Sequence, residues 1–79
     1  MAAETTAEEN ARKVLSIYRH YGVRPGGALS TQQFLDIAPN VGLSENDLLN
    51  GVRYGGEKGW FEDGPNGSMR LTEAGFAEI

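Results

Sequence analysis

The chain has 79 residues, a formal net charge of −4 at neutral pH and no cysteine. This length allows one small domain, and the lack of cysteine excludes disulfides and thiolate metal sites. No apolar stretch approaches the roughly 20 residues that span a bilayer, and the N-terminal residues lack the basic and apolar regions of a secretory signal. We therefore expect a cytoplasmic protein that does not bind membranes.

The N-terminal third predicts a flexible segment followed by a helix. Residues 1–6 are small and polar without periodicity, so we expect a flexible terminus and a single domain over residues 7–79. Glu8 and Arg12 are spaced as an i,i+4 ion pair, and Gly22 is a typical helix stop. Apolar residues recur at helical spacing and form one stripe: Ala11, Val14, Leu15, Tyr18 and Tyr21.

A very short extended segment, residues 28–29, precedes two further helices. Ser30 with Gln33 forms a capping-box pattern, which predicts that a helix begins after Ser30. Pro39 limits this helix to about two turns. Ser44 caps the next helix, which Gly59 ends. The residues predicted to face inward are Phe34, Leu35 and Ala38 on the first helix and Leu48, Leu49 and Val52 on the second.

The C-terminal part predicts a hairpin and a short helix. Residues 60–62 and 68–71 have strand character, and the turn-rich residues 63–67 join them. Thr72 then caps a final helical turn or two, which we expect to return Phe76 and Ile79 to the core.

The order of these elements resembles the winged helix-turn-helix family over residues 11–79. The resemblance implies an α+β fold with a three-helix core, a β-hairpin wing and a short terminal helix. Gly55 departs from the family pattern, which often has an apolar residue packing the helix end there. Three short motifs carry the resemblance: Leu43-Ser44 with Leu48, Leu49 and Val52; Gly59-Trp60-Phe61; and Leu71-Thr72-Glu73-Ala74-Gly75.

A weaker resemblance is to a degenerate EF-hand-like helix-loop-helix pair. Residues 27–34 are similar to the second half of an EF-hand loop and its following helix, and Leu29-Ser30 with Phe34 is repeated as Leu71-Thr72 with Phe76. The first ligand positions would be Gly22, Arg24 and Gly26, which offer no carboxylate for calcium. The repeat is better explained by two entries from a strand into a helix.

The winged-helix resemblance implies binding of double-stranded DNA, as in a transcriptional regulator. With Leu48, Leu49 and Val52 inward, helical geometry directs Asn46, Asn50 and Arg53 outward, and their side chains suit base edges. Arg70 is the one cation near the predicted wing tip, residues 63–67. These four residues, Asn46, Asn50, Arg53 and Arg70, form the predicted DNA-binding site.

The distribution of charge favours the alternative, a protein-interaction domain that binds a partner or forms a homodimer. Residues 1–39 hold four basic and four acidic groups, whereas residues 40–79 hold three basic and seven acidic ones. An acidic second half disfavours phosphate contacts. Trp60 and Phe61 are adjacent, so a strand would leave one of them at least partly exposed beside Tyr54. These three aromatic residues form the predicted protein-interaction patch.

The sequence offers no catalytic constellation. His20 is the single histidine, and it has neither a plausible nucleophile nor an orienting partner. Without cysteine or a second histidine, a zinc site is not expected. We therefore predict a non-enzymatic binding module without a metal or small-molecule cofactor, with DNA binding as the leading function because winged helices so often have it.

Overall fold

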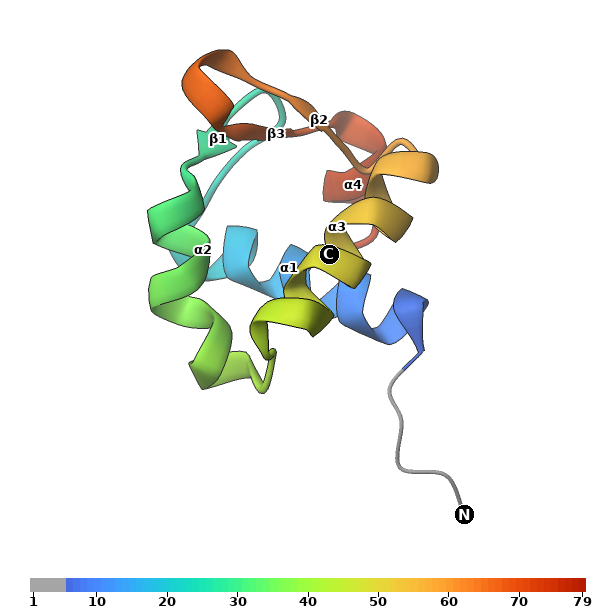
Figure 1. The fold of residues 1–79 in the computed structure, drawn as a ribbon. Coiled ribbons are helices and arrows are strands. Elements are labelled where there is room, and N and C mark those ends of the chain that lie inside the picture. Colours follow the sequence, from blue (N-terminus) through green and yellow to red (C-terminus); the bar gives the residue numbers. More distant parts are fainter. Residues whose placement is uncertain (1–5) are drawn as a thin grey trace.

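The computed structural model describes residues 6–79, which form four α-helices and a three-stranded antiparallel sheet (Figure 1). Residues 1–5, most of the predicted flexible terminus, lie outside the described residues. The elements are α1 (Ala7–Tyr21), β1 (Ala28–Leu29), α2 (Thr31–Ile37), α3 (Glu45–Glu57), β2 (Phe61–Asp63), β3 (Met69–Leu71) and α4 (Glu73–Ala77), with 3-10 turns at Ala38–Val41 and Pro65–Gly67.

Polar caps set where the four helices begin. The side chain of Ser30 accepts a hydrogen bond from the backbone N–H of Gln33, whose side chain accepts one from the Ser30 N–H, so the predicted capping box is confirmed. Ser44 and Thr72 cap α3 and α4 as predicted. Thr6, the last residue of the predicted terminus, caps α1 through a second capping box.

Two helix ends also follow the sequence pattern. Gly22 takes the left-handed conformation directly after α1, with φ of 67°, and its N–H bonds back to the helix. The α-helical part of α2 ends at Ile37, and the chain continues through a 3-10 turn that contains Pro39. The first end begins the loop between α1 and β1, and the second begins the short connection between α2 and α3.

The sheet has the strand order β1-β3-β2, so β3 is the central strand. Glu62 is paired with Arg70, and Phe61 with Leu71. The predicted hairpin is confirmed, although β2 begins and ends one residue later than expected, and β3 begins at Met69 rather than Ser68. In Figure 1 the sheet lies at the top of the view, where α2 begins beside β1 and toward which α3 runs.

The core lies between α1 and the elements around it. α1 packs most extensively on α3, and its Tyr18 is fully buried. The Tyr18 ring contacts Phe34 edge-on and stacks on Phe61, with ring centres 5.4 and 5.5 Å apart. Its hydroxyl donates a hydrogen bond of 2.8 Å to the Met69 carbonyl. Tyr18 therefore links α1 to α2 and to both hairpin strands.

Four apolar residues that the sequence placed in the core are exposed instead. Leu35, Leu49, Phe76 and Ile79 all retain large exposed areas, with Leu49 the most exposed at 59%. α2 and α4 are short, so each has room for only a narrow buried face, and that face is taken by Phe34 on α2 and by Gly75 on α4. On α3 the buried face is that of Leu48, and Leu49 lies at its edge.

Candidate functional site

Three of the predicted DNA-binding residues share one face of α3. Asn46, Asn50 and Arg53 are all exposed, and their spacing of four and three residues places them along one side of the helix. The orientation predicted for these side chains is confirmed. The face ends at Glu57, one turn after Arg53, which gives it an acidic group as well as a basic one.

Arg70 does not join this face. Side chains alternate along a strand, and the neighbours of Arg70 on β3, Met69 and Leu71, point toward α3 and the core. Arg70 therefore points to the outer face of the sheet, where its guanidinium lies 3.5 Å from a carboxylate oxygen of Glu62. The four predicted DNA contacts thus divide into three on α3 and one on the far side of the hairpin.

The predicted aromatic patch is wrong for Trp60 and Phe61, since both side chains are buried. The strand alternation on which the prediction depended does not apply, because Trp60 precedes β2 and lies outside the pleat. Gly75 of α4 packs directly on the Trp60 carbonyl, and the Arg12 guanidinium lies 5.2 Å from the centre of the Trp60 ring. Side chains of α1 and α3 therefore contact the Trp60 ring, and α4 packs on its backbone.

Tyr54 is half-buried and belongs partly to the same cluster. Its ring contacts that of Trp60 edge-on, with ring centres 5.8 Å apart. The Lys58 ammonium lies over the Tyr54 ring, 5.5 Å from its centre. Tyr54 is thus an edge of the core with a cation beside it, and it does not form a free aromatic patch.

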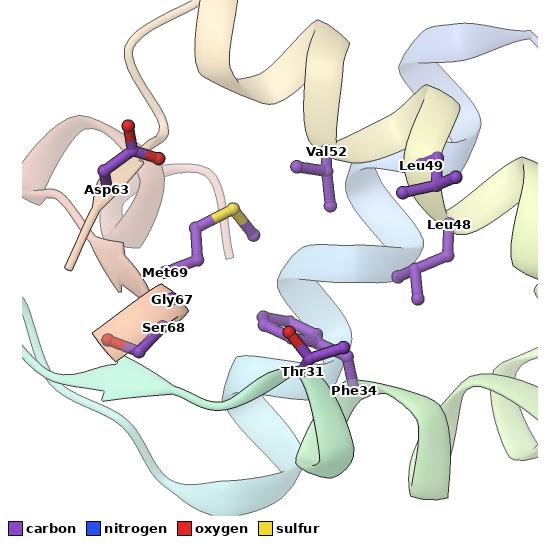
Figure 2. Close-up of a pocket in the computed structure, with 9 residues that line it drawn as sticks. All are labelled: Thr31, Phe34, Leu48, Leu49, Val52, Asp63, Gly67, Ser68 and Met69. Atoms are coloured by element: carbon purple, nitrogen blue, oxygen red, sulfur yellow. The ribbon is translucent and has the colours of Figure 1, made fainter. Parts of the chain in front are cut away.

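An apolar cavity of about 220 Å³ lies between α3 and the hairpin. We call it the α3–hairpin hollow. Figure 2 shows Leu48, Leu49 and Val52 on the α3 side, Thr31 and Phe34 on α2, and Met69 extending from the hairpin into the space between them. Asp63, Gly67 and Ser68 complete its lining.

The one charged side chain that lines this hollow is a carboxylate, while Arg53, four residues after Leu49 on α3, adds a cation beside it. None of its lining residues is Lys or Arg, and Asp63 is the one ionisable group among them. Glu45 is exposed and precedes Leu48 and Leu49 by three and four residues, so it shares their side of α3. The sequence analysis did not predict this site because it placed Leu49 in the core. Two adjacent leucines on one helix, Leu48 and Leu49, point in directions about 100° apart, and this was the signal that one of them could lie at the surface.

Arg12 on α1 is held by carboxylates. Its guanidinium lies 3.1 Å from Glu8, as the sequence spacing predicted, and 3.2 Å from Glu78. Hydrogen bonding to Glu8, followed by that to Glu78, raises the pKa of Arg12. Arg12 therefore serves the packing of α1 against Trp60 and the C-terminal residues.

Near the start of α1, hydrogen bonds from Thr6 lower the pKa of Glu9.

No protein-family model, curated protein or solved structure matches this chain. Within residues 6–79, no group of three or more His, Asp and Glu side chains is arranged to hold a metal ion. No helix in the same part of the chain is both long and apolar enough to cross a membrane.

Proposed function

We propose that the chain is a winged-helix module that binds a protein segment in the α3–hairpin hollow. The winged-helix assignment is supported by the strand order β1-β3-β2 and by the position of α3 directly before the hairpin. In this assignment α3 is the recognition helix and β2–β3 is the wing. Fold alone does not define what is bound, so the ligand is argued from the surface.

The single observation that carries the proposal is the apolar hollow with an exposed leucine at its edge. Leu49 is 59% exposed on the helix that winged-helix proteins use for recognition, and Leu48, Val52 and Met69 line the hollow beside it. Apolar surface gains free energy when a partner removes it from water. A recognition face organised around such side chains suits a protein partner better than a phosphate backbone.

Charge supports the same choice. Residues 45–70 hold five acidic and three basic groups, and of the basic ones Arg70 pairs with Glu62 on the outer face of the sheet. Proteins that bind DNA depend on several Lys or Arg contacts to phosphates. On the exposed face of α3, Arg53 is followed one turn later by an acidic residue, Glu57.

Selection from a random peptide library displayed on phage tests this function. We expect clones that bind the wild-type protein and lose binding to Leu49→Glu, because a carboxylate at the edge of the hollow would have to be desolvated. Leu35→Glu is the matched control, since Leu35 is also an exposed helical leucine but lies outside the hollow. Clones that bind both variants equally, or no enriched clones at all, would refute the proposal.

DNA binding is the second candidate function. It is favoured by one specific observation, the exposure of Asn46, Asn50 and Arg53 along one side of α3. Asn and Arg side chains can form bidentate hydrogen bonds with adenine and guanine. A wing that adds few cations leaves this candidate with little electrostatic affinity for phosphates.

A further inference from the structure

The size of the α3–hairpin hollow limits what can occupy it. Pockets for cofactors and other small molecules usually measure about 300–1,000 Å³, whereas this one has about 220 Å³. An apolar cavity of about 150 Å³ is known to hold a benzene molecule. The hollow therefore has room for one aromatic or branched apolar side chain, and the rest of a ligand would lie outside it.

The charges beside the hollow define what lies outside. Asp63 is on the hairpin side and Leu49 and Val52 are on the α3 side, across the hollow (Figure 2). Glu45 lies one turn before Leu48 on α3. An extended or helical segment that inserts one side chain would bring its neighbouring residues close to these carboxylates, where cations are favoured.

We propose that the hollow accepts a partner segment with one large apolar side chain flanked by Lys or Arg, and that Asp63 selects for the basic flank. This inference rests on the proposed function, because it names the partner of the same site. The apolar side chain supplies most of the affinity through burial. Asp63 supplies discrimination, since opposite charges steer a partner and an acidic flank is repelled.

The adjacent carboxylate, Glu62, provides a built-in control. Glu62 and Asp63 are consecutive on β2 and therefore point to opposite faces of the sheet. Glu62 pairs with Arg70 on the outer face, whereas Asp63 is paired across the hairpin with Met69, whose side chain enters the hollow. Removing either carboxylate changes the net charge by the same amount, but only the removal of Asp63 changes the charge that lines the hollow.

The test is a titration of the isotopically labelled chain, followed by two-dimensional NMR, with three synthetic peptides. The peptides share a central phenylalanine and differ in its neighbours, which are lysine, serine or glutamate. We expect the lysine peptide to shift the amide signals of Leu49, Val52 and Met69 and to bind several-fold more tightly than the serine peptide. This advantage should fade as salt is added, because exposed charges are screened.

The variants separate Asp63 from overall charge. Asp63→Asn should weaken the lysine peptide by about two- to five-fold, the range for an exposed ion pair, and leave the serine peptide unchanged. Glu62→Gln should change neither. Equal binding of the lysine and serine peptides, or equal effects of the two variants, would overturn the inference while leaving the hollow as a peptide site. Failure of all three peptides to shift the hollow would overturn both this inference and the proposed function.

Discussion

Gly55 on α3 lies directly against the ring of Phe61 on β2, so that a Cβ at position 55 would overlap the ring. The same ring stacks on Tyr18 of α1. The absence of a side chain at Gly55 therefore lets the hairpin approach α3 and place Phe61 in the core. The glycine that departs from the winged-helix pattern is a packing requirement of this chain.

Gly55→Ala should destabilise the protein by about 1–3 kcal/mol, the usual cost of overpacking a core, even though alanine favours a helix. The matched control is Gly56→Ala, because a Cβ there meets no atom within 4 Å. That variant should gain up to about 1 kcal/mol from helix propensity. Urea unfolding measures both changes, and stabilisation by Gly55→Ala would show that Phe61 can move aside.

Thr72→Ala should cost about 1–2 kcal/mol of stability. The Thr72 hydroxyl accepts a hydrogen bond from the N–H of Gly75 at 3.0 Å and lies 2.5 and 3.0 Å from the carbonyl oxygens of Gly59 and Trp60. It thus joins α4 to the connection between α3 and β2. Thr72→Ser retains the hydroxyl and should recover most of the loss in thermal unfolding; equal losses in the two variants would assign the effect to the methyl group.

Alkaline pH should destabilise the protein through Tyr18. Burial raises the pKa of the Tyr18 hydroxyl above its ordinary value of 10.0, so above about pH 10 the tyrosine ionises in the unfolded chain while it stays neutral in the folded one. Stability is therefore fully present below that pH and falls as the pH rises. Thermal unfolding at several pH values should show a steeper alkaline loss for the wild type than for Tyr18→Phe, and parallel losses would contradict this.

The elements of the fold could be predicted because they depend on local chemistry. The helix caps depend on hydrogen bonds between residues only three apart in the sequence, so the spacing alone predicts them. They involve Ser30 with Gln33, Ser44 with Asp47, and Thr72 with Gly75. Gly22 likewise acts where it stands in the chain. Such signals do not require knowledge of distant contacts.

The faces of the short elements could not be predicted in the same way. The exposure of Leu49 depends on which side of α3 meets the hairpin, and the burial of Trp60 depends on its contact with Arg12 of α1. Both involve residues far apart in sequence. The hollow itself arises where α2, α3 and β3 meet, so no single segment could reveal it.

Asn10 shows the same limit inside the core. Its side chain is 2% exposed, and its Oδ1 has no hydrogen-bond partner within residues 6–79. Gly51 of α3 lies against the Asn10 backbone, where a Cβ would come within 2.6 Å of the carbonyl carbon. The close crossing of α1 and α3 therefore depends on Gly51. The sequence pattern alone indicates only that a glycine inside a helix lowers its helix propensity.

Titration with mixed-sequence duplex DNA distinguishes the two candidate functions. At moderate salt we expect only weak, non-specific binding, because residues 45–70 hold five acidic groups and only three basic ones and so offer few phosphate contacts. Arg53→Ala should then have no larger effect than Arg24→Ala, an exposed arginine in the loop between α1 and β1. A loss of about 1–3 kcal/mol of binding free energy in Arg53→Ala alone, as expected for a bidentate base contact, would instead establish α3 as a DNA reader and set the peptide proposal aside.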